Sequence, residues 1–142
     1  MDIRFIAGFG PITRSGQEGL DFWSTAFGLR FDEMAPDYYH AHGLAGANVF
    51  GLWPLGQAAE ATLGTADWPA DRPVPQAWLE FEMASPEAVA EGERELAAGG
   101  HELLVGAHAE PWGQWTARLQ SPEGLLVGLS YMPDFHPEGR GG

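Results

Sequence analysis

A helix with both ends marked is predicted by residues 15–31, SGQEGLDFWSTAFGLRF. Ser15 and Glu18 have the spacing of a capping box, in which their side chains satisfy free backbone amides of the first turn. Gly28 is placed to end the helix, because glycine readily adopts the left-handed conformation common there. The helix should lie on a sheet through one apolar face, formed by Leu20, Trp23 and Phe27.

Strand-like stretches flank this helix, and the same order of elements then occurs again. A strand is expected at residues 3–12 before the helix, and three follow it, at 30–34, 37–42 and 47–53. The chain therefore contains two modules of one strand, one helix and three strands. In the second module, Ser85 caps the helix, which ends at 99–100, and the strands are expected at 78–83, 102–105, 116–120 and 125–131.

The repeated order predicts an α+β fold class with two βαβββ modules in one domain. A chain of 142 residues is long enough for one core and too short for two ordinary domains. The domain is expected at 1–132, with module one at 1–56, a connector at 57–76 and module two at 77–132. Residues 133–142, rich in Gly and Pro, are expected to form a flexible tail.

The composition argues against several classes of function. Seven basic residues against twenty acidic ones give a net charge of -13, so no nucleic-acid partner is expected. The absence of cysteine excludes disulfides, thiolate zinc sites and cysteine nucleophiles. No apolar run approaches the length of a membrane helix, so we expect a cytoplasmic protein without a membrane partner. The acidic charge could steer a cationic small molecule or could simply maintain solubility.

Alternation along the strands predicts which side chains share a face. In the strand at 78–83, Leu79, Phe81 and Met83 form an apolar face that should meet the helix. In the strand at 116–120, Ala117 and Leu119 should face the helix as well. The opposite face of both strands is then a wet or ligand-lined surface, which carries Trp78, Glu80, Glu82, Thr116 and Arg118.

Two motifs resemble those of the vicinal oxygen chelate superfamily, which includes glyoxalase I, extradiol dioxygenases, fosfomycin-resistance transferases and bleomycin-resistance proteins. Residues 22–29, FWSTAFGL, approximate the Phe-Tyr pair followed by Leu-Gly-Leu of that family. Residues 121–125, SPEGL, stand where the family has Asp-Pro-Asp-Gly-Asn. The resemblance covers residues 1–132 and implies that the two modules form curved mixed sheets around a cleft. It also implies a homodimer with clefts shared between subunits, as in the bleomycin-resistance branch.

In the enzymes of this superfamily, His and Glu side chains from separate strands hold a divalent metal in the cleft. The resemblance places the four ligand positions near Gly8, Gly51, Trp78 and Gly128, none of which can bind a metal. We therefore expect no metal and no other cofactor. Three glycines beside a tryptophan leave space for an organic ligand, although glycines could also simply fit a tightly curved sheet.

Aromatic and charged residues are the candidates for binding such a ligand. Several indoles with Tyr39 could stack on a flat conjugated molecule, or could serve as ordinary core packing. Arg118 could bind a carboxylate or carbonyl of the ligand, or could pair within the protein with Glu80 or Glu82. The expected ligand-binding residues are Tyr39, Trp53, Trp78, Glu80, Glu82, Trp112, Arg118, Gly8, Gly51 and Gly128, while the role of Trp115 is left open.

Two histidines offer a different interpretation. His40 and His42 lie two apart in an expected strand, so both imidazoles face one side and could chelate a metal with Glu80 or Glu82. They could equally be a surface pair, since no third ligand is fixed by the sequence. No role is assigned to the remaining histidines, His101, His108 and His136.

The favoured hypothesis is a metal-free binding protein that sequesters an aromatic or conjugated molecule, such as an antibiotic, and has no catalytic residues. The competing hypothesis is a lyase, isomerase or dioxygenase. It would use a relocated metal site at His40 and His42, or acid–base chemistry at Glu80 or Glu82. A third hypothesis is a cleft without a ligand in a protein that acts through protein contacts.

Overall fold

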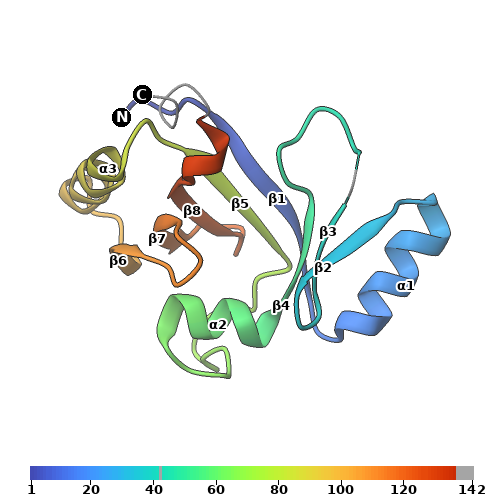
Figure 1. Ribbon diagram of the computed structural model, residues 1–142. Coiled ribbons are helices and arrows are strands. Elements are labelled where there is room, and N and C mark those ends of the chain that lie inside the picture. Colours follow the sequence, from blue (N-terminus) through green and yellow to red (C-terminus); the bar gives the residue numbers. More distant parts are fainter. Residues whose placement is uncertain (42, 137–142) are drawn as a thin grey trace.

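The computed structural model describes residues 1–41 and 43–136, and both modules have the predicted order of elements (Figure 1). Module one consists of β1 (Phe5–Thr13), α1 (Gly16–Phe27), β2 (Phe31–Ala35), β3 (Tyr38–Ala41) and β4 (Gly51–Pro54). Module two consists of β5 (Ala77–Glu82), α3 (Pro86–Ala98), β6 (Leu103–Ala109), β7 (Trp115–Gln120) and β8 (Leu126–Tyr131).

The strands form one eight-stranded sheet in the order β2-β3-β4-β1-β5-β8-β7-β6. Within the modules, β1 pairs with β4 and β5 pairs with β8, both in parallel, and the remaining pairs are antiparallel. The modules join where β1 pairs antiparallel with β5, so each half of the sheet repeats the other. The predicted α+β fold of two βαβββ modules in a curved, open sheet is confirmed.

Two segments differ from the sequence-based expectation. The expected connector at 57–76 overlaps a helix, α2 (Leu55–Leu63), which buries Ala58, Ala59 and Thr62. Its N-cap residue, Pro54, makes no side-chain cap, so the usual start signal is missing. Of the expected flexible tail, residues 133–135 form a 3-10 turn and His136 is buried, while 137–142 lie outside the described residues.

Side-chain caps begin the helix of each module as predicted. The Ser85 hydroxyl accepts from the Ala88 amide at 3.1 Å, and the Ser15 hydroxyl accepts from the Glu18 amide at 3.4 Å. Gly28 ends α1 at φ 69°, in the left-handed region where a side chain would be strained. None of the helices in the described part of the chain is long and apolar enough to cross a membrane.

The two faces of the sheet carry separate cores. On the face toward α3, Met83, Val89, Ala117 and Leu129 form one buried cluster with Phe81 beside them, which confirms the predicted alternation. On the opposite face, α2 packs against a second cluster that contains Ile12, Trp53, Trp68, Trp78 and Leu126.

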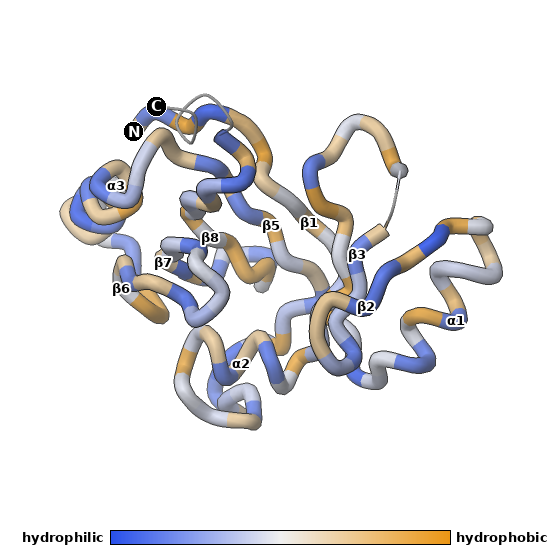
Figure 2. The backbone as a smooth tube through the Cα atoms, viewed as in Figure 1, coloured by the Kyte–Doolittle hydropathy of each residue, from blue (hydrophilic) through white to orange (hydrophobic). Residues whose placement is uncertain are grey.

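Helix α1 covers its half of the sheet less completely than α3 does. Hydrophobic residues recur along α1 (Figure 2), yet Phe22 and Phe27 are 55% and 61% exposed. Trp23 packs on Phe50 of the sheet, and Phe50 contacts the exposed Phe9. Module one therefore leaves a cluster of aromatic side chains partly exposed beside α1. Its members are Phe9, Phe22, Trp23, Phe27 and Phe50.

Candidate functional site

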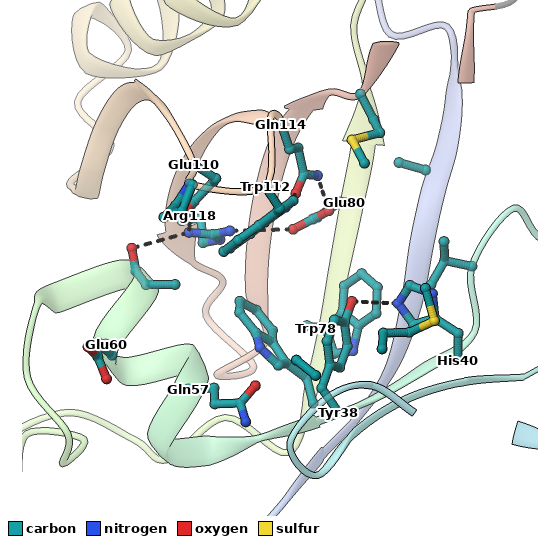
Figure 3. A pocket seen from close by; sticks show the side chains of 18 of the residues that line it. Tyr38, His40, Gln57, Glu60, Trp78, Glu80, Glu110, Trp112, Gln114 and Arg118 are labelled. Carbon is teal, nitrogen blue, oxygen red and sulfur yellow. Dashed lines mark hydrogen bonds and ion pairs between the residues drawn. The ribbon is translucent and has the colours of Figure 1, made fainter. Parts of the chain in front are cut away.

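A cavity of about 650 Å³ opens on the face of the sheet that α2 covers (Figure 3). Its walls come from strands β1 to β5 and β7, from α2, from residues 110–114 between β6 and β7, and from residues 132 and 135 after β8. The size suits a drug-sized ligand. The lining residues are Ala7, Met34, Ala35, Tyr38, His40, Val49, Trp53, Gln57, Glu60, Ala61, Trp78, Glu80, Glu110, Pro111, Trp112, Gln114, Arg118, Met132 and Phe135.

One side of the cavity, the aromatic end, consists of Tyr38, His40, Trp53 and Trp78. Figure 3 labels Tyr38, His40 and Trp78 among them. The rings of Trp53 and Trp78 meet edge to face, with centroids 6.1 Å apart. The Trp78 indole N–H donates to the carbonyl of Gly51 at 3.0 Å, which fixes the ring against β4. Both predicted tryptophans thus line the cavity and also belong to the core beneath it.

The three glycines proposed as ligand-binding residues do not line the cavity. A Cβ atom on Gly8 would lie 2.9 Å from Cη2 of Trp78, and one on Gly51 would lie 3.2 Å from Cζ2 of the same ring. A Cβ atom on Gly128 would lie 3.1 Å from Cγ of Glu80. The glycines make room for side chains of the protein itself, so the space expected for a ligand at these positions is occupied by Trp78 and Glu80.

Strand β3 turns Tyr38 and His40 into the cavity, whereas the predicted Tyr39 is absent from the lining. Tyr39 alternates to the opposite face, because successive side chains of a strand point to opposite sides. The Tyr38 hydroxyl and Nε2 of His40 lie 2.6 Å apart. Burial raises the pKa of Tyr38 and lowers the pKa of His40, so the tyrosine donates to a neutral imidazole. His42 lies outside the described residues.

The other side of the cavity, the polar end, consists of Glu80, Glu110, Gln114 and Arg118. Arg118 is 1% exposed, and its Nη1 donates to Glu110 Oε1 at 2.8 Å. The guanidinium carbon lies 5.2 Å from the ring centroid of Trp53, which adds a cation–π contact. The predicted pairing of Arg118 within the protein is present, although its nearest carboxylate is Glu110, a residue that the sequence analysis missed.

Glu80 lies between Arg118 and Gln114 in Figure 3. Its Oε1 accepts from the Gln114 amide at 2.9 Å, and its Oε2 lies 3.8 Å from Nη2 of Arg118. Burial raises the pKa of Glu80, and the charge of Arg118 and the Gln114 hydrogen bond partly offset that rise. A buried carboxyl of this kind can orient a ligand or exchange a proton with it.

Glu82 was predicted to share this surface, but it is fully buried and does not line the cavity. Its carboxylate accepts from Ser130 Oγ, from the Met132 amide and from His136 Nε2, each at 2.7 Å. These bonds anchor residues 132–136, whose Met132 and Phe135 reach the cavity. Glu82, which was predicted to bind the ligand, therefore pairs with His136, which was assigned no role, and the two hold a wall of the cavity in place.

The segments outside the predicted strands supply the remaining wall. Helix α2 contributes Gln57 and Glu60, and neither could be expected while that region was taken as a connector. Trp112, which was predicted, lines the mouth and is 51% exposed, and its indole donates to Gln114 Oε1 at 2.7 Å. Trp115, whose role had been left open, is absent from the lining.

The four positions at which the resemblance implies metal ligands carry residues that do not bind metals. Gly8, Gly51 and Gly128 have no donor side chain, and the Trp78 indole has no free lone pair for a metal. Within residues 1–41 and 43–136, no three His, Asp or Glu side chains converge as a metal site would require. The residues at the four positions therefore do not fit a divalent ion.

Comparison of the sequence with models of known families gives no match, and comparison with curated proteins gives none. Solved structures do match. A glyoxalase/bleomycin resistance protein/dioxygenase superfamily member from Vibrio splendidus 12B01 is 12% identical, with a TM-score of 0.59 over 92% of this chain and 100% of that chain. At such identity the likeness is one of fold.

Two further structures match at similar levels. A protein described as an NAD-dependent benzaldehyde dehydrogenase from Legionella pneumophila is 13% identical, with a TM-score of 0.60 over 88% of this chain and 97% of that chain. The Mn(II)-bound glyoxalase from Novosphingobium aromaticivorans is 19% identical, with a TM-score of 0.51 over 92% of this chain and 38% of its own length. The shared architecture thus occurs in proteins described by different activities.

Proposed function

Because the chain has the fold of the vicinal oxygen chelate superfamily, we propose that it binds a flat aromatic or conjugated small molecule and sequesters it without metal. The observation that carries this proposal is the cavity of about 650 Å³, which combines aromatic walls with a few fixed polar groups. Such a combination is typical of organic ligand sites, where apolar walls supply affinity and the polar groups supply orientation.

Stacking on indole and phenol rings is the proposed source of affinity. Tyr38, Trp53, Trp78 and Trp112 all border the cavity. Each aromatic contact contributes on the order of 1 kcal/mol beyond the burial of apolar area. A matching structure described as belonging to a superfamily that includes bleomycin-resistance proteins supports the further proposal that the ligand is an antibiotic.

Trp112 offers the cleanest test, because it lines the cavity and is largely exposed, so its removal should leave the core intact. Quenching of tryptophan fluorescence would be titrated with a panel of planar aromatic compounds that includes quinoline. For a compound that binds, Trp112→Ala should raise the dissociation constant about tenfold, or about 1.4 kcal/mol.

The matched control is Trp115→Ala, which removes a partly exposed indole that does not line the cavity. This variant should bind with unchanged affinity. If no compound of the panel binds the wild-type protein, or if both variants lose affinity equally, the proposed site is wrong.

A second candidate function, acid–base catalysis, is favoured by the raised pKa of Glu80 at the polar end. In that case a bound compound would be converted by a lyase or isomerase reaction. Liquid chromatography with mass spectrometry of the compound after incubation with the protein distinguishes the candidates, because the chromatographic step also separates isomers of equal mass. Conversion by the wild type that is lost in Glu80→Gln would favour an enzyme, and recovery of the unchanged compound would favour sequestration.

We also propose that the protein is a homodimer. Three side chains of the aromatic cluster in module one, Phe9, Phe22 and Phe27, are 43%, 55% and 61% exposed, which is unusual for large apolar residues so close together. A second copy could cover them. Light scattering should give twice the mass of the chain, and Phe22→Glu with Phe27→Glu should give the mass of one.

A further inference from the structure

The polar end contains a donor, Nη2 of Arg118, and an acceptor, Oε2 of Glu80, that lie close together without forming a hydrogen bond. Nη1 of Arg118 is committed to Glu110 Oε1 at 2.8 Å and to the carbonyl of Ala61 at 3.4 Å. The guanidinium is further fixed over the ring of Trp53. Nε and Nη2 of Arg118 are buried, and within the described residues neither has a hydrogen-bond partner.

Glu80 is fixed in a complementary way. Its Oε1 accepts from Gln114 at 2.9 Å, while Oε2 stands 3.8 Å from Nη2 of Arg118, beyond hydrogen-bond length. The side-chain amide of Gln114 cannot reverse without loss, because its Nε2 also donates to Ser130 Oγ at 2.8 Å and its Oε1 accepts from Trp112. Oε1 of Glu80 therefore accepts from a fixed donor, and Oε2 is the oxygen that is available to a ligand.

A buried donor without a partner costs about 1–3 kcal/mol, so a ligand that supplies the missing partners gains affinity. Nη2 needs an acceptor and Oε2 needs a donor. The two atoms lie 3.8 Å apart, and the residues that carry them both line the cavity. A ligand carboxylate would meet an acceptor at Glu80, and a ligand ammonium would meet the cation of Arg118. One ring edge with a carbonyl next to an N–H satisfies both atoms.

We propose that Arg118 and Glu80 together recognise an aromatic lactam or carboxamide, whose carbonyl accepts from Arg118 Nη2 and whose N–H donates to Glu80 Oε2. This inference rests on the proposed function, because it assumes that the cavity holds a planar ligand. It narrows the ligand class from any aromatic compound to those with an amide edge. The charged and titratable groups around Glu80 are Arg118, Tyr38, Glu82 and Glu110.

Three bicyclic probes of similar shape test the proposal. Carbostyril carries the lactam edge, N-methylcarbostyril keeps the carbonyl but lacks the N–H, and quinoline lacks both. Tryptophan fluorescence titration gives the three dissociation constants. Carbostyril should bind at least tenfold more tightly than either other compound, because a site built to pair a polar group rejects the analogue that lacks it.

Glu80→Gln provides the second measurement, because it separates hydrogen bonding from the bulk of the added methyl group. In this variant Gln114 still donates toward the first oxygen position, so the new amide nitrogen takes the place of Oε2. A donor would then face the lactam N–H. The preference for carbostyril over N-methylcarbostyril should fall to about one, while an unchanged far-UV circular dichroism spectrum shows that the variant is folded.

Each outcome separates this inference from the proposed function. If all three probes bind wild type with equal affinity, or if Glu80→Gln retains the preference for carbostyril, the amide-edge inference is wrong and the aromatic site stands. If none of the three binds while other planar compounds do, the inference is again wrong. If no planar aromatic compound binds at all, both proposals fail.

Discussion

The two ends of the cavity lie on equivalent faces of two similar modules, yet their chemistry differs. The aromatic end lies over β1 and β4, where Gly8 and Gly51 leave room for the indole of Trp78. The polar end lies over β5 and β7, where Glu80 and Arg118 project from strand centres. The repeated fold supplies equivalent positions, and the side chains at those positions decide whether a large ring or a charge pair fills them.

The difference is also one of energetics. The aromatic end is stabilised by burial of large rings, whose contribution changes little with pH or salt. The polar end depends on one guanidinium that is shared by two buried carboxylates, so the loss of a single group leaves charges without a partner. The polar end should therefore be the more fragile of the two.

Replacement of Arg118 should have the largest effect. Arg118→Ala leaves Glu80 and Glu110 buried without their cation and should lower the free energy of unfolding by about 3–5 kcal/mol. Urea denaturation followed by far-UV circular dichroism measures the change. Arg72→Ala removes a partly exposed arginine that pairs with the exposed Glu102, and it should cost less than about 1 kcal/mol. Equal losses in the two variants would contradict the assigned role of the polar end.

The aromatic end should respond to a single added methyl group. Gly8→Ala would place Cβ 2.9 Å from Trp78 Cη2 and 2.9 Å from Val49 Cβ, and the indole is too rigid and too firmly held to yield easily. Overpacking of this kind costs about 1–3 kcal/mol of unfolding free energy. The control is Gly56→Ala in α2, where the nearest atom is the Ala66 carbonyl oxygen at 3.4 Å.

Gly56→Ala should leave stability unchanged or raise it by up to about 1 kcal/mol, because alanine is the better helix former. Thermal and urea unfolding of both variants would check the pair. Should Gly8→Ala prove as stable as Gly56→Ala, Trp78 would not fill the space above β1, and the explanation of the glycines would have to change.

The sequence predicted residues of both ends of the cavity where the alternation along a strand was clear. Alternation along well-defined strands placed Trp78, Glu80 and Arg118 on one face, and the cavity contains all three. Tyr39 was chosen in place of Tyr38, although the alternation that links Tyr38 to His40 already indicated the correct side. In a four-residue strand, an error of one position moves a side chain to the other face.

Other differences arise from information that a pattern along the chain does not contain. The complete burial of Glu82 depends on the curvature of the sheet and on how residues 132–136 pack over its carboxylate. Neither follows from the alternation of side chains along the strand. Helix α2 lacks a capping side chain and has a short buried face. The sequence therefore carries no start signal for a helix there, and the segment was interpreted as a connector. The position of the Trp78 ring over two glycines depends on its rotamer, which only the packed structure decides.

The smallest effect expected is on the pH dependence of stability, and its sign should differ between the two ends. Burial raises the pKa of Glu80, so the folded protein keeps this proton after the unfolded chain has released it. The free energy of unfolding should therefore fall as pH rises from the usual range of a glutamate toward the higher folded-state pKa. Glu80→Gln cannot titrate, and this fall should be absent from its profile.

His40 at the aromatic end should act in the opposite direction. Burial lowers its pKa, so the unfolded chain takes up a proton near the usual histidine pKa of 6.5 while the folded imidazole remains neutral. The free energy of unfolding should fall as pH drops below that value, and His40→Gln should remove this contribution. Urea unfolding of wild type and both variants from about pH 4 to pH 8 gives the three profiles. Parallel profiles would show that neither group titrates differently on folding, and the electrostatic contrast between the two ends would then be lost.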